Sequence, residues 1–171
     1  TAVPGDRPFG VSLRADPRWP EIISMVQANK DRLEANYDKP LVALLDSIFD
    51  EDQTLRRSIG DVQAKYGRDS KEMQELWREM AEKDSLNLIV VTRILDERGW
   101  LGPDVIGERG SSALFLVIQH SDQATQEKYL PMMRDAVAKG NARGSSLALL
   151  EDRVALGQGK RQTYGSQVGD D

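Results

Sequence analysis

The only histidine of this chain, His120, follows the apolar run of residues 113–118, and imidazole is the side chain best suited to exchanging protons near neutral pH. Asp122 lies two residues further on and is a candidate to orient the ring. Residues two apart on a helix do not face each other, so this pairing requires the helix to end between them. A role in the core or as a helix cap is the alternative interpretation of His120.

Two aspartates occupy positions where a helix that packs along one seam needs apolar side chains. Between residues 41 and 66, apolar residues recur in alternating steps of four and three, and Asp52 interrupts the series. A second series has its polar exceptions in the middle: Met73, Trp77, Met80, Asp84, Asn87, Val91 and Ile94. Asp52, Asp84 and Asn87 are therefore candidates for chemistry inside a helical seam.

These two segments are separated only by Gly67-Arg68-Asp69, so we expect an antiparallel hairpin of two helices of almost equal length. Opposed residues are then equally distant from the turn centre near residue 68, and Asp52 and Asp84 meet this condition. Two carboxylates that face each other in a buried seam cannot both ionise comfortably. Either one pKa rises, or a cation, an arginine such as Arg56 or the imidazole of His120 lies between them.

The elements that position these side chains predict an all-α fold. We expect the long antiparallel hairpin, the apolar helix that ends at His120 packed against it, and two further C-terminal helices. Residues 1–19 are predicted to form an irregular N-terminal arm, residues 20–157 a single helical domain, and residues 158–171 an irregular C-terminal tail. The expected helix starts are marked by Pro20, Pro40, a capping box of Asp69 with Glu72, Asp122, and Ser145 or Ser146.

Composition excludes several classes of protein. A chain of 171 residues with 39% hydrophobic residues can form one domain with a core, and its net charge of -5 argues against nucleic-acid binding. The apolar runs are far shorter than the roughly 20 residues that span a bilayer, so we expect a soluble domain without a transmembrane segment. The sequence leaves open the oligomeric state and the choice between the cytoplasm and export after signal removal.

Metal and cofactor chemistry finds little support in the sequence. Cysteine is absent, and the phosphate-binding loop and nucleophile elbow have no complete counterpart. A carboxylate-bridged metal pair needs Glu-x-x-His motifs on two helices, which one histidine cannot supply. We therefore predict no metal site, with a single hard cation held by Asp52, Asp84 and Asn87 as the less favoured alternative. No cofactor is indicated.

Four motifs stand out in the second half of the chain: Gln119-His120-Ser121-Asp122, Tyr129-Leu130-Pro131, Leu149-Leu150-Glu151-Asp152-Arg153 and Tyr164-Gly165-Ser166-Gln167. With them the chain resembles a bacterial domain-of-unknown-function family, numbered six-six-two-four, over about residues 44–167. The resemblance includes Asp52-Gln53 with Arg56 and Asp84 with Asn87, where the seams are polar. Because the family has no assigned activity, the resemblance implies a shared site without naming its chemistry.

We predict a polar pocket that serves either a small enzyme with acid–base chemistry or a binder of a small anionic ligand or peptide. The expected catalytic residues are His120, Asp84 and Asp52, with His120 as general base or acid beside a carboxylate of raised pKa. The expected ligand-binding residues are Gln53, Arg56, Asn87, Gln119, Asp122, Asp152, Arg153, Tyr164 and Gln167. The alternative is an interaction module, such as an immunity or envelope protein, whose buried polar residues only set the helix register.

Overall fold

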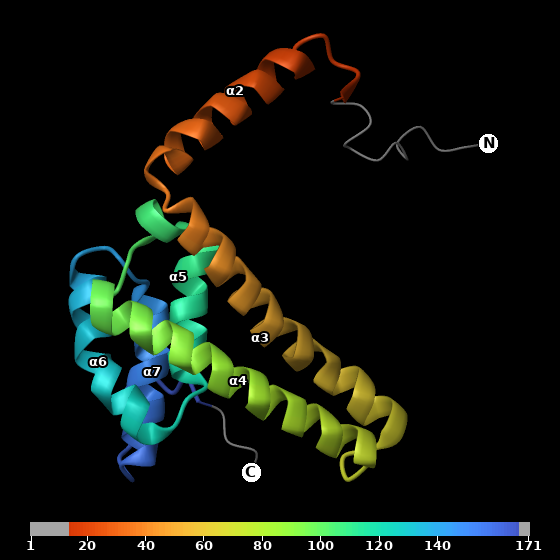
Figure 1. Ribbon diagram of the computed structural model, residues 1–171, viewed down its shortest axis with the longest axis vertical. Helices are drawn as coiled ribbons and strands as arrows, with labels where there is room; N and C mark the ends of the chain where they lie inside the picture. Colours follow the sequence, from red (N-terminus) through yellow and green to blue (C-terminus); the bar gives the residue numbers. More distant parts are fainter. Residues whose placement is uncertain (1–13, 168–171) are drawn as a thin grey trace. The chain divides into compact units, whose positions relative to one another are not determined.

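The computed structural model describes residues 14–167, and within that range the chain forms helices and turns but no strand. The prediction of an all-α fold is confirmed. The helices in chain order are α2 (Trp19–Leu33), the short 3-10 helix η1 (Glu34–Asn36), α3 (Lys39–Tyr66), α4 (Lys71–Arg98), α5 (Pro103–Gln119), α6 (Gln123–Ala138) and α7 (Gly144–Gly157) (Figure 1).

The chain divides into two compact units, the first ending at Asn36 and the second beginning at Tyr37. In the first unit, α2 contains the helix start predicted at Pro20, but none of its residues is buried. Most of the predicted arm of residues 1–19 lies outside the described residues. The predicted domain of residues 20–157 spans the division between the two units and stays a prediction.

Helices α3 and α4 form the predicted hairpin. Each is 28 residues long, and Figure 1 shows them as two long arms whose connecting turn lies away from α6 and α7. The turn begins at Gly67, where a φ of 93° favours glycine. The predicted capping box of Asp69 with Glu72 is wrong, because the turn includes Asp69 and the Ser70 side chain accepts the hydrogen bond from Met73 N.

The main core is built around α5, which contacts α3, α4, α6 and α7. Most of its residues from Ile106 to Gln119 are buried, because residues 113–118 are apolar on every side of the helix. Gly107 interrupts the first turn with a φ of 70°, so the regular part of the helix starts after it. The predicted packing of the apolar helix against the hairpin is confirmed.

A second, smaller cluster fills the part of the hairpin nearer its turn. Met73, Leu76 and Met80 are buried there against partly buried residues of α3. Trp77, which the apolar series places in the seam, is instead 49% exposed. The prediction for Trp77 is wrong because the neighbouring Leu76 takes the inward position.

Helices α6 and α7 complete the second unit. Asp122 caps α6 as predicted, since its side chain accepts a hydrogen bond of 2.8 Å from Thr125 N. The predicted cap at Ser145 or Ser146 is wrong, because α7 already starts at Gly144 and has no side-chain cap. Residues 158–167 have no helix, as the predicted tail requires. Among the described residues, no helix is long and apolar enough to cross a membrane.

Candidate functional site

The ring of His120 is held by Asp52. His120 follows the last residue of α5, so its side chain leaves the helix end and brings Nδ1 within 2.9 Å of Asp52 Oδ1 on α3. The side chain of Asp52 is only 2% exposed, whereas that of His120 is 20% exposed. In the neutral ring this contact makes Nδ1–H the donor and leaves Nε2 as an acceptor. Asp52 therefore orients the imidazole, while Asp122 caps α6.

Arg56 lies between the two opposed aspartates of the hairpin. Its Nη2 is 2.8 Å from Asp84 Oδ2 and 3.5 Å from Asp52 Oδ1, and its Nε donates to Nε2 of His120 at 3.4 Å. One guanidinium thus reaches both carboxylates, which confirms the predicted register and the arginine alternative. The described residues contain no group of three or more side chains suited to hold a metal. The less favoured alternative was a hard cation between Asp52 and Asp84, and the guanidinium of Arg56 lies at that position.

The pKa of Asp52 is lowered rather than raised. Burial acts to raise this pKa, but the interaction with His120, the Gln53 amide and the charge of Arg56 outweigh it. Gln53 donates from Nε2 to Asp52 Oδ2 at 2.7 Å, so both carboxylate oxygens are hydrogen-bonded. The sequence predicts a carboxylate of raised pKa beside His120, and this prediction is wrong for Asp52. Its ionised form is stabilised by His120, Gln53 and Arg56.

Arg153 on α7 carries a positive charge that contacts only neutral acceptors. Its Nε and Nη2 donate to Gln167 Oε1 at 3.1 and 2.9 Å, and its Nη1 donates to the Gln119 carbonyl oxygen at 2.8 Å. It forms no ion pair with a carboxylate of the described residues. Burial and the nearby charge of Arg56 hold the pKa of Arg153 below its usual value. Arg153 is thus a half-buried cation without a contacting counter-ion.

Asp152 holds the C-terminal tail against α7. Its buried carboxylate accepts hydrogen bonds from the backbone N–H groups of Thr163, Tyr164 and Ser166, at 2.7, 3.0 and 2.8 Å. Burial acts to raise the pKa of Asp152, but these N–H donors lower it to about 2. The anchored tail carries Gln167, the acceptor for Arg153, so Asp152 helps to fix the position of that acceptor.

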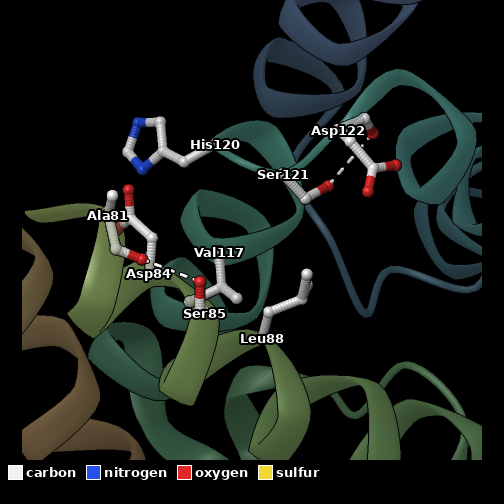
Figure 2. Close-up of a pocket in the computed structure, with 8 residues that line it drawn as sticks. All are labelled: Ala81, Asp84, Ser85, Leu88, Val117, His120, Ser121 and Asp122. Carbon is white, nitrogen blue, oxygen red and sulfur yellow. Dashed lines mark hydrogen bonds between the residues drawn. The ribbon is translucent and has the colours of Figure 1, made fainter.

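Two open hollows share His120, Asp84 and Ala81. The first, the arginine hollow, has a volume of about 410 Å³ and is lined by Arg56, Ile59, Trp77, Met80, Ala81, Asp84, His120 and Arg153. The second, the serine hollow, has a volume of about 300 Å³ and is lined by Ala81, Asp84, Ser85, Leu88, Val117, His120, Ser121 and Asp122. Figure 2 shows the serine hollow with His120 and Asp84 side by side and Asp122 at some distance from them.

The structure brings half of the sequence-predicted site residues together. Hydrogen bonds link four of them in a chain, from Asp52 to His120, Arg56 and Asp84. Gln53 donates a hydrogen bond to Asp52, and Arg153 lines the arginine hollow together with Arg56, Asp84 and His120. Whether these residues form a functional site stays a prediction. Trp77 lines the arginine hollow, although the sequence predicts it only as a seam residue. The one signal in the sequence is the preceding Leu76, a second apolar residue that can take the inward position.

Three other predicted residues lie apart from the hollows. Tyr164 is 58% exposed, and its hydroxyl donates to Glu151 at 3.0 Å. Asn87 and Gln119 are buried, and neither is among the described residues that line the two hollows. Asn87 Nδ2 and Gln119 Oε1 have no hydrogen-bond partner among the described residues, and only the backbone carbonyl of Gln119 contacts Arg153.

Fold and polar cluster together define an all-α domain with a His–Asp–Arg network in the middle of a helical hairpin. Residues 37–170 match the family of unknown function DUF6624, and the chain therefore belongs to this family. This family match confirms the resemblance seen in the motifs. It begins at Tyr37, which is also the first residue of the second unit. The comparisons with curated proteins and with solved structures found no match to this chain.

Proposed function

We propose that this domain binds a small organic anion in the arginine hollow, where His120 exchanges a proton with the bound molecule. The observation that carries this proposal is the guanidinium of Arg153, which is half-buried and contacts only neutral acceptors. A cation in such a place is stabilised by an anionic partner, and the remaining N–H groups of the guanidinium can donate to one. Concave sites that combine apolar walls with a few polar groups are typical of ligand binding.

The geometry of His120 supports the acid–base part of the proposal. Asp52 engages Nδ1, so Nε2 is the nitrogen left to accept a proton from a ligand. The contact of 3.4 Å from Arg56 Nε to Nε2 is longer than the usual N–H donor distance of about 2.9–3.0 Å. A ligand donor can therefore compete with Arg56 for this nitrogen.

A non-enzymatic interaction module is the second candidate. It is favoured by one observation, namely that Arg56 forms ion pairs with both Asp52 and Asp84 inside the protein itself. In that case the network only sets the register of α3 against α4. The module predicts that the double variant His120→Ala, Asp84→Asn loses stability alone, and that small anions leave the environment of His120 unchanged.

The single histidine provides a direct test. Because His120 is the only histidine of the chain, its ring signals in an NMR spectrum belong to this site. We would titrate the full chain with sodium acetate and, at equal ionic strength, with sodium chloride. The expected result is a saturable shift of the His120 signals with acetate only. Arg153→Met should abolish it, whereas Arg93→Met, which removes an exposed arginine paired with Glu97, should leave it unchanged.

A shift that stays linear with acetate concentration, or that is the same in Arg153→Met, would contradict the proposal and favour the module. Thermal unfolding of each variant checks that the fold is kept. Arg153→Lys provides a second measurement, because it keeps the charge but loses the forked contact with Gln167. It should retain a weakened response to acetate.

A further inference from the structure

The arginine hollow has apolar side chains beside its charged ones. Ile59 from α3 and Trp77, Met80 and Ala81 from α4 line it together with Arg153. Ile59 and Met80 belong to the smaller apolar cluster near the hairpin turn, so this cluster continues to the surface of the hollow. An anion bound to Arg153 therefore lies near an apolar surface.

Trp77 is the largest element of that surface. The neighbouring Leu76 is buried in the hairpin, which leaves Trp77 turned outward and 49% exposed. An indole ring presents a broad flat apolar surface, and it packs well against another ring in an offset or edge-to-face arrangement. Single exposed apolar residues are common on proteins, but this one borders a hollow that also holds an arginine without a counter-ion.

The charge of the hollow favours a single negative charge on the ligand. Of the two arginines that line the hollow, Arg56 is already paired with Asp84 and Asp52, whereas Arg153 contacts no carboxylate of the described residues. A second negative charge would lie close to Asp84 and would be repelled by it. A carboxylate fits this balance better than a dianionic phosphate group.

We infer that the ligand of the arginine hollow is a monocarboxylate that carries a flat apolar group, with the carboxylate at Arg153 and the apolar group against Trp77. This inference rests on the proposed function and adds the class of ligand to it. The volume of about 410 Å³ lies in the lower part of the range of about 300–1,000 Å³ typical of small-molecule pockets. An aromatic acid with a short chain is of this size.

Three probes that share parts of this structure test the inference. Acetate supplies the carboxylate alone, hydrocinnamate supplies a carboxylate and a phenyl ring, and hydrocinnamamide supplies the ring without the charge. Dissociation constants are measured from the His120 ring signals and by calorimetry on the full chain. We expect hydrocinnamate to bind at least about tenfold more tightly than acetate, because burial of the ring adds to the contact of the carboxylate. The amide should bind far more weakly than the acid.

Variants separate the two parts of the ligand. Trp77→Ser should bring the affinity for hydrocinnamate close to that for acetate, while the acetate affinity stays unchanged. Ile89→Ser is the matched control, since it removes another exposed apolar side chain of α4 that does not line the hollow. It should keep the preference for hydrocinnamate.

The outcomes distinguish this inference from the proposed function. If acetate binds saturably but hydrocinnamate binds no more tightly, the aromatic part is overturned and the proposed function stands. If none of the three probes gives a saturable response, the proposed function itself fails. A preference for hydrocinnamate that survives Trp77→Ser, or an amide that binds as tightly as the acid, also overturns the inference.

Discussion

Asp52 and Asp152 are the two buried aspartates among the described residues, and the regions around them hold a carboxylate in different ways. Asp52 lies in the hairpin seam and is held by side chains from two helices, with His120 at Oδ1 and Gln53 at Oδ2. Asp152 lies on α7 and accepts hydrogen bonds from backbone N–H groups of the tail. Both carboxylates have a lowered pKa, so burial alone does not distinguish them.

The difference lies in what each region can do. Around Asp52, the partners include the titratable His120 and the charged Arg56, and His120 faces two open hollows. Around Asp152, the partners are backbone groups that cannot titrate, and the result is a fixed tail that holds Gln167 beside Arg153. We infer that the first region supplies the chemistry of the candidate site, and the second positions the charge that attracts a ligand. Each of the following predictions tests this division.

The largest effect is expected for Asp152→Ala. Several backbone N–H groups of the tail lose their acceptor at once, and breaking a buried hydrogen-bond network is among the most damaging changes. We expect Tm to fall by about 5 °C or more and residues 158–167 to become sensitive to limited proteolysis. The response to acetate should also weaken, because Arg153 loses the support of Gln167.

Asp135→Ala is the control for this prediction. Asp135 is an exposed residue of α6 that pairs only with Lys139 four residues on, and such pairs contribute little to stability. Its Tm should stay close to that of the wild type. A Tm of Asp152→Ala equal to that of this control would show that the tail is not held by Asp152.

A smaller effect is expected for Asp52→Asn. The amide oxygen can still accept from His120, and Asp84 still pairs with Arg56, so we expect a loss of about 1 to 3 kcal/mol in the free energy of unfolding. The ring nitrogens report the change more sharply. In the wild type, nitrogen chemical shifts should show that the neutral ring of His120 carries its proton on Nδ1. In the variant, they should show two exchanging neutral forms, one with the proton on Nδ1 and one with it on Nε2. A wild-type proton on Nε2 would contradict the orienting role of Asp52.

The smallest effect is the contribution of each carboxylate to acid stability. Backbone N–H donors hold the pKa of Asp152 at about 2 in the folded protein, below its ordinary value of 3.8, and the pKa of Asp52 is also lowered. Such groups contribute stability that is complete above the unfolded pKa and is lost as the pH falls through the folded pKa. In urea unfolding from about pH 5 to pH 2, the wild type should lose more stability than Asp152→Asn does. Equal slopes for both would contradict the lowered pKa.

Asp52→Asn refines this measurement. It should flatten the same acid dependence less than Asp152→Asn, because three backbone N–H groups donate to Asp152, whereas two side chains hydrogen-bond to Asp52. If Asp52→Asn instead removes most of the acid dependence, ionised Asp52 contributes more to the stability of the fold than ionised Asp152. That result would contradict the division of roles between the two regions.

The amino-acid sequence by itself determined the hairpin, its register and the polar layer inside it. The steps of four and three that end at a glycine turn are local properties of the chain, and they placed Asp52 opposite Asp84 before any contact was seen. The cap at Asp122 was predictable for the same reason, since a capping side chain bonds to the backbone of its own helix.

Only the tertiary structure decided which side chains surround that layer. It placed Arg56 between the aspartates, turned Trp77 outward in favour of Leu76, and gave Arg153 neutral acceptors from α5 and the tail. The tertiary structure also lowers the pKa of Asp52. The sequence instead predicted that the carboxylate beside His120 has a raised pKa. These outcomes depend on how helices distant in sequence pack together, because a side-chain conformation and a pKa are set by all neighbours at once.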